Sequence, residues 1–357
     1  MLKVIIMTRT QINLVLMPAV LVMVFGCDRF DRSRIQMPAF NFVTRENLHS
    51  IARADAQHIW VSGNYGTILC SADGGKTWEK QDSGIAEELL GCISFVNPKE
   101  GWAAGVRGTI VHTADGGKTW GVQPSGIEQD IHDIFFLDAH YGWAVGESGT
   151  VLHTDDGGKH WKRQREPEDR YFNDVFFVDR KTGWIVGEFG TILHSADGGA
   201  TWQPQECPEL AALVKNAEWD RPLPALYGAY FPDRDRGWIV GMDGVVIRTE
   251  NGGKTWALAK PVSEKPLYSI VMHGAKGWAV GNEGVYVMTE NGGDTWAVKN
   301  QALKTKFWLR AVSFGDDKRG LIVGAQGTIA LTDDGGFSWK LISGYSYDMK
   351  EFGLADF

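Results

Sequence analysis

Apolar residues occur along this chain in short runs, separated by segments rich in glycine, aspartate and asparagine. Residues 131–164 show the pattern: the runs are IHDIFFLD, GWAVG, GTVLHT and HWKRQ, and the connections are DAHYG, ESG and DDGGK. Runs of this kind, bounded by turn residues, are typical of β-strands. The pattern therefore predicts four strands in this segment. Elsewhere the only helix we expect is a short one that Pro208 would begin.

The same four-run pattern recurs seven times, and each repeat contains the hexapeptide DGGKTW or a close variant. The copies begin at residues 73, 115, 156, 197, 251, 291 and 334, so successive starts lie 42, 41, 41, 54, 40 and 43 residues apart. A GxxG tetrapeptide precedes every copy. Four strands per repeat at a period near 40 predict an all-β fold, a seven-bladed β-propeller of four-stranded blades. The one long spacing marks an insertion at about residues 205–225.

The hexapeptide has the composition of a structural turn. Its glycines supply the positive φ of a tight hairpin, its first residue accepts hydrogen bonds from nearby backbone amides, and its tryptophan packs between blades. One reaction needs one site, and Ca²⁺ needs six to eight oxygen ligands. We therefore expect no catalytic residue, no metal and no cofactor here. The predicted structural residues are Asp73, Asp115, Asp156, Asp197, Asn251, Asn291 and Asp334, with Trp78, Trp120, Trp161, Trp202, Trp256, Trp296 and Trp339.

Two copies carry a wider motif. SADGGKTW at 71–78 and HSADGGATW at 194–202 resemble the Asp box, or bacterial neuraminidase repeat, S-x-D-x-G-x-T-W. Together with the GW-x-x-G column found in nearly every repeat, residues 45–345 resemble the photosystem II stability and assembly factor propellers. The resemblance implies Asp-box blades and a non-enzymatic protein that docks on a membrane protein complex.

The Asp box also occurs in sialidases, so a sialidase-like glycoside hydrolase and a carbohydrate-binding propeller are the alternatives. A sialidase needs three arginines that converge on a carboxylate, together with a tyrosine nucleophile. Only Arg310 stands near the start of an expected innermost strand, although Tyr227 and Tyr268 are present there. We therefore predict that the chain is not an enzyme.

The N-terminus predicts export. Lys3 and Arg9 precede the apolar run INLVLMPAVLVMVF, which is short for a spanning helix, and Cys27 follows it. This order is typical of a bacterial lipoprotein signal; ordinary cleavage and an uncleaved anchor are the alternatives. We expect a signal peptide at 1–26, a lipidated Cys27 with a tether over 27–44, the propeller at 45–345 and a tail at 346–357. The protein would be lipid-anchored to a membrane on its extracytoplasmic, periplasmic side.

Charge and loop variation indicate a protein partner. The net charge of −8 argues against nucleic-acid binding. One face of the ring would hold the GxxG turns, whose two inner residues differ in every blade. There we expect a monomeric propeller to bind a basic, partly apolar protein segment. The candidate residues are Glu147, Glu188, Asp243 and Glu283 on four adjacent blades, Arg310 at the channel mouth, and Trp219 in the insertion.

Overall fold

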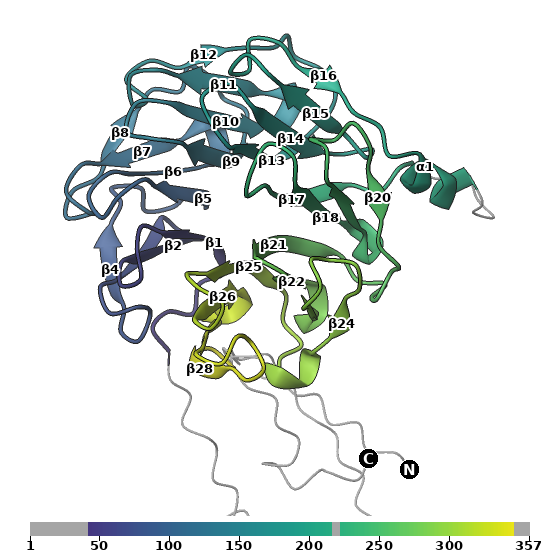
Figure 1. Ribbon diagram of the computed structural model, residues 1–357. Helices are drawn as coiled ribbons and strands as arrows, with labels where there is room; N and C mark the ends of the chain where they lie inside the picture. The colour runs from purple at the N-terminus through teal and green to yellow at the C-terminus, as the bar shows by residue number, and fades with distance from the viewer. Residues whose placement is uncertain (1–41, 216–221, 346–357) are drawn as a thin grey trace, which may run out of the picture. The chain divides into compact units, whose positions relative to one another are not determined.

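The computed structural model describes residues 42–215 and 222–345, which all belong to one compact unit, Ala39–Phe357. These residues form seven four-stranded antiparallel sheets arranged as blades around a ring, so the predicted seven-bladed β-propeller is confirmed (Figure 1). Cys27, the expected signal peptide, most of the expected tether, Trp219 and the expected tail lie outside the described residues.

Each blade is one contiguous stretch of chain with its four strands hydrogen-bonded in sequence order. Blades one to four contain β1 Leu48–Arg53, β2 Ile59–Gly63, β3 Thr67–Ser71 and β4 Glu79–Asp82; β5 Leu90–Phe95, β6 Gly101–Gly105, β7 Ile110–Thr113 and β8 Gly121–Gln123; β9 Ile131–Phe136, β10 Gly142–Gly146, β11 Val151–Thr154 and β12 Lys162–Arg163; β13 Phe172–Phe177, β14 Gly183–Gly187, β15 Ile192–Ser195 and β16 Gln203–Pro204. Blades five to seven contain β17 Leu226–Tyr230, β18 Gly237–Gly241, β19 Val246–Thr249 and β20 Ala257–Leu258; β21 Leu267–His273, β22 Lys276–Gly281, β23 Tyr286–Thr289 and β24 Ala297–Val298; β25 Leu309–Phe314, β26 Gly320–Gly324, β27 Ile329–Thr332 and β28 Lys340–Ser343.

The first strand of each blade lies innermost, around the central channel, and the fourth lies at the rim (Figure 1). The second strands are fully buried, as in the pattern of β10. The short helix expected at Pro208 is present as α1, Pro208–Lys215, which stands outside the ring between blades four and five (Figure 1). Among the residues that the structure describes, no helix is both long and apolar enough to cross a membrane.

Aromatic side chains join successive blades. Trp102 of β6 stacks on Phe136 of the next blade with ring centroids 3.5 Å apart, and Trp161 packs edge-on against Phe136. The indole N–H of Trp102 donates to the carbonyl of Gly157, the first glycine of the next blade's box, at 3.1 Å. This arrangement buries a large apolar area and satisfies the indole N–H, so it holds neighbouring blades at a fixed distance.

Candidate functional site

The seven GxxG turns lie together on one face of the ring, with the links between blades; we call this the hairpin face. In every turn the second inner residue is a non-glycine residue with a φ between 52° and 58°. These residues are Tyr65, Arg107, Ser148, Phe189, Asp243, Glu283 and Gln326. A left-handed conformation is unfavourable for such residues, so neighbouring contacts must hold each turn in place.

Hydrogen bonds to the links hold these turns. In blade three the N–H of Glu147 donates to the carbonyl of Asp130 at 3.0 Å, and the N–H of Gly149 donates to Arg170 of the next link at 2.7 Å. Blade four repeats this with Glu188 and Tyr171 at 3.0 Å. The hairpin face is therefore a rigid ring of turns with fourteen variable positions, two in each of the seven turns, of which Ala325 is buried.

The structure places the four predicted acids on four consecutive turns of this face. The Glu147 carboxylate accepts a hydrogen bond from the Asp130 N–H at 3.4 Å, and Glu188 accepts one from Tyr171 at 3.1 Å. Glu283 pairs with the Lys265 ammonium at 2.7 Å. The four acids therefore add negative charge to the face, but at least three of them also have local partners.

Arg310 lies at the mouth of the channel rather than on the hairpins. Its guanidinium is 5.0 Å from the ring centroid of Tyr268, and Tyr268 lies 5.5 Å from Tyr227. Burial lowers the pKa of Arg310, while the two tyrosines act in the opposite direction. Burial also lowers the pKa of His49, whose ring bonds to Asn64 at 2.8 Å. The mouth is therefore lined by aromatic rings around one half-buried cation.

Two further acids line the channel, and the sequence analysis missed them. Asp133 accepts a hydrogen bond from the Val175 N–H of the next blade at 3.1 Å, and Asp174 accepts one from Ala229 at 2.6 Å. Burial raises the pKa of Asp174 well above its ordinary value, and the charge of Asp133 raises it further. One sequence feature could have revealed them, namely the third residue of the innermost strands. This residue is aspartate in IHDI and FNDV, whereas it is serine in LHSI and LYSI.

The Asp boxes lie on the opposite face, and each one closes its own turn. In all seven the side-chain oxygen of the first box residue accepts the backbone N–H four residues later, at 2.9–3.0 Å. The N–H and hydroxyl of Thr119 hold the pKa of Asp115 at about 2. Both box glycines have φ between +70° and +92° throughout. Asn251 makes the same bond as the aspartates, so the turn needs an oxygen acceptor rather than a charge.

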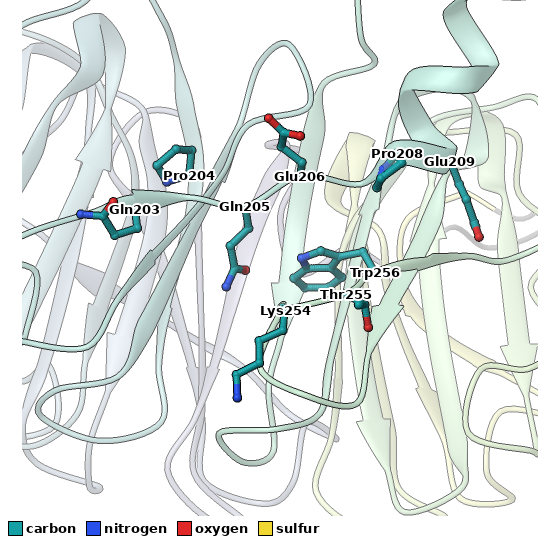
Figure 2. A pocket seen from close by; sticks show the side chains of 10 residues that line it. Gln203, Pro204, Gln205, Glu206, Pro208, Glu209, Lys254, Thr255 and Trp256 are labelled. Atoms are coloured by element: carbon teal, nitrogen blue, oxygen red, sulfur yellow. The ribbon is translucent and has the colours of Figure 1, made fainter.

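Several cavities lie near these surfaces, among them one of about 630 Å³ beside Arg107 on the hairpin face. A cavity of about 650 Å³ opens at the rim beside α1, lined by Gln205, Pro208, Lys254 and the edge of the buried Trp256 (Figure 2). A smaller one of about 280 Å³ lies in the channel beside Asp133. Within the described residues, no group of three or more histidine, cysteine, aspartate or glutamate side chains is placed to hold a metal ion.

Comparison with known proteins identifies the family of the chain. The family model described as "Photosynthesis system II assembly factor YCF48" matches residues 32–125, 122–208, 165–220 and 221–307, which is more than half of the chain. The chain belongs to this family. The resemblance seen in the sequence is thereby confirmed. A search of curated proteins gave no match.

Solved structures share the fold of this YCF48 family member. A structure titled "YCF48 bound to D1 peptide" is 20% identical with a TM-score of 0.67, covering 82% of this chain and 95% of that one. YCF48 from Cyanidioschyzon merolae has the same identity and TM-score, covering 82% and 97%. A GH74 xyloglucanase from Xanthomonas campestris is 10% identical with a TM-score of 0.66, covering 86% of this chain and 55% of that one. At these identities the likeness establishes the propeller fold alone.

Proposed function

We propose that this chain is a non-enzymatic, lipid-anchored propeller that binds protein and assists the assembly or stability of a membrane complex. The observation that carries the proposal is membership of the YCF48 assembly-factor family over most of the ring. The family member titled as bound to D1 peptide binds a protein segment on the same fold, which supports a protein partner here.

The hairpin face is the proposed binding surface. Its turns are held rigidly by backbone hydrogen bonds, yet the side chains they present differ in every blade. The Asp-box face repeats one turn seven times, and each box residue is used within that turn. A surface that must distinguish one partner from others needs variable side chains on a rigid support. Glu147, Glu188, Asp243 and Glu283 would steer a basic segment toward this surface.

The proposed membrane anchor is a lipid on Cys27. It would hold the propeller at the extracytoplasmic, periplasmic surface of a membrane. Residues 28–41 of the tether would give it a reach of roughly 45 Å if fully extended, at about 3.3 Å per residue. The acidic propeller would then work as a monomer beside its membrane-embedded partner, without nucleic acid, metal or cofactor.

Glycoside hydrolysis is the less supported alternative. A hydrolase of this kind needs two carboxyl groups on either side of a substrate site, roughly 5–10 Å apart. In the channel Asp133 and Asp174 instead bond to the backbone of neighbouring blades, and the pKa of Asp174 is raised by its burial and its closeness to Asp133. The likeness to the GH74 enzyme extends to the fold alone.

Native gel electrophoresis of membrane complexes tests the proposal. We expect cells that lack the chain to accumulate an incomplete membrane complex. Full-length protein should restore the complete complex, and Cys27→Ala should lose lipid labelling, leave the membrane fraction and restore it poorly. If every membrane complex assembles normally without the chain, the assembly role is wrong. If Cys27→Ala stays membrane-bound after carbonate washing, the anchor is wrong.

A further inference from the structure

Large exposed apolar side chains gather in one sector of the hairpin face. Tyr171 is 41% exposed, Phe189 is 47% exposed and Met242 is 39% exposed. All three lie on the turns or the leading link of blades four and five, and we call them the apolar crescent. Tyr65, in the first blade, is a further exposed aromatic side chain on a turn of this face.

Backbone hydrogen bonds fix the three segments of the crescent relative to one another. Tyr171 and Glu188 bond to each other twice, through backbone and side chain, which brings Tyr171 against the Phe189 turn. Gly190 donates to the carbonyl of Pro224 at 3.0 Å, and Met242 donates to that of the adjacent Ala225 at 2.8 Å. The Phe189 and Met242 turns are therefore fixed on consecutive residues of one link. The three residues therefore belong to neighbouring backbone segments that hydrogen bonds hold in place, and the Tyr171 ring lies 5.6 Å from that of His132.

Two acids, Glu188 and Asp243, stand on the same turns as Phe189 and Met242. Burial and the neighbouring Tyr268 raise the pKa of Tyr227 at the channel mouth, Arg310 lowers it, and Glu188 and Asp243 raise it further. The nearest base, Arg170, lies 6.0 Å from the Phe189 ring centroid, donates to Thr191 at 2.8 Å and approaches Glu168 at 4.0 Å. The cation is thus already engaged beside the aromatic ring.

We propose that the apolar crescent anchors an extended segment of the partner that carries an apolar side chain next to a lysine or arginine. The apolar side chain would pack on Phe189 and Met242, while its basic neighbour would lie beside Glu188 and Asp243. Exposed aromatic and methionine side chains are typical anchors in protein interfaces, and the acids supply charge complementarity. Anionic lipid is disfavoured by the same charges. This inference rests on the proposed function, because it names the partner chemistry of that face.

The decisive variant is the double substitution Phe189→Ser and Met242→Ser in the full chain. Its matched control is Tyr65→Ser, which removes a 60% exposed aromatic at the same turn position as Phe189, with φ of 53° against 55°. All of these side chains are exposed, so thermal unfolding should be unchanged within the error of the measurement. A second variant, Glu188→Gln combined with Asp243→Asn, removes both negative charges. The side-chain amide oxygen introduced at position 188 can still accept the hydrogen bond from the Tyr171 N–H.

Synthetic peptides that differ in one feature are the probes. One presents a leucine–lysine core in a neutral background, the second leucine–glutamate and the third serine–lysine. We expect the first to bind at least tenfold more tightly than the others, and to weaken as salt rises because exposed charges are screened. The double apolar variant should lose tenfold or more, the charge variant severalfold, and Tyr65→Ser less than twofold. Equal binding of the leucine–glutamate peptide, or unimpaired binding by the double variant, would overturn the inference.

Photo-crosslinking separates failure of this inference from failure of the proposed function. Benzoylphenylalanine is placed at position 189, at position 65 and on the Asp-box face at position 337, each in full-length protein on native membranes. A crosslink at 189 to an apolar-basic protein segment supports the crescent. Protein crosslinks only at the other positions overturn the crescent and leave the binding function standing. If no position crosslinks to a protein, both the apolar crescent and the protein-binding function are contradicted. If the crescent binds anionic vesicles, the membrane rather than a protein segment occupies it, and the inference is overturned.

Discussion

One contact between blades differs from the other six. Where blades one to six each meet the next, the second strand contributes a tryptophan: Trp60, Trp102, Trp143, Trp184, Trp238 and Trp278. Five of these stack within 3.5–3.8 Å of a phenylalanine of the next blade. Where blade seven meets blade one, Leu321 stands in the tryptophan column. Arg53 stands in the phenylalanine column, so both partners of the stack are replaced.

Other contacts close the ring at this seventh contact, which we call the closing seam. The N–H of Val43, just before β1, donates to the Ser343 hydroxyl of the last strand at 3.1 Å. Gln326 donates to the Asn47 side chain, and Arg53 donates to Ser313 at 3.3 Å. Aliphatic residues, among them Leu321, fill the space between the blades. Among the described residues no strand is exchanged between the first and last blades, so hydrogen bonds and the packing of aliphatic residues with Trp78 replace the aromatic stack. We expect this seam to be the weakest.

The largest expected effect is that of removing an aromatic stack. Trp143→Ala should lower the free energy of unfolding by about 3–5 kcal/mol, because it empties a fully buried site and leaves Phe177 without its partner. Leu321→Ala at the closing seam should cost less, about 2–3 kcal/mol, since fewer buried atoms are removed. Denaturant unfolding of both variants measures the difference. An equal or larger loss for Leu321→Ala would refute the ranking of the seams.

Installing the missing stack should sharpen the comparison. Leu321→Trp alone should destabilise by about 1–3 kcal/mol, because the closing seam is already filled by aliphatic side chains. Adding Arg53→Phe supplies the ring on which the new indole would stack. A double-mutant cycle should then show a favourable coupling of about 0.5–1.5 kcal/mol. The Trp143 and Phe177 pair serves as the reference, and a coupling of zero in both cycles would contradict the role given to these stacks.

The blade-to-blade contacts also differ beside the channel, in how their contribution to stability depends on pH. Asp133 and Asp174 bond across to the next blade, whereas Ala311 occupies the equivalent position of the closing seam. Burial raises the folded-state pKa of Asp174, so the native state retains a proton that the unfolded chain loses near pH 4. Its contribution therefore falls as pH rises from about 4 through the raised pKa.

Asp174→Asn mimics the protonated acid and retains an acceptor for Ala229. We expect a higher melting temperature than wild type at pH 8 and almost none of that gain at pH 4. Asp115→Asn is the control in which stability depends on pH in the opposite direction. The folded-state pKa of Asp115 is lowered to about 2, so the stabilisation contributed by its carboxylate is lost as pH falls toward 2. A gain for Asp174→Asn that is equal at both pH values would contradict the assignment.

The smallest effect belongs to a single hydrogen bond at the closing seam. Ser343→Ala should cost about 0.5–1.5 kcal/mol by leaving the Val43 N–H without its acceptor. Amide exchange at Val43 should quicken, while the amides of β9 and β10 stay protected. Ser62→Ala is the control, since this buried hydroxyl makes no hydrogen bond within the described protein and its removal should be nearly neutral. Unchanged exchange at Val43 would show that the bond does not close the ring.

The repeat made the fold predictable, whereas side-chain direction limited prediction of the site. Spacing and turn residues were enough for seven blades, because each blade repeats the same local chemistry. The four acids lie on the hairpin turns, as their GxxG positions indicate, yet Glu147 and Glu188 accept hydrogen bonds from backbone amides that the sequence does not reveal. Asp133 and Asp174 were missed because a polar residue within an innermost strand fits the ordinary alternation of polar and apolar side chains. Tyr171 and Met242 are far apart in sequence, and only the shared link beside Ala225 brings them to one sector.

Construction of each blade from one contiguous segment also affects how the protein is made. During synthesis the N-terminal blade emerges first, and its four strands pair with one another without waiting for the C-terminus. Each later blade finds its predecessor already present, so the tryptophan stacks form one after another as the chain lengthens. Only the contact between the last and first blades must wait for the whole polypeptide. The ring therefore closes in a single final step, made by the one contact whose second strand contributes no tryptophan.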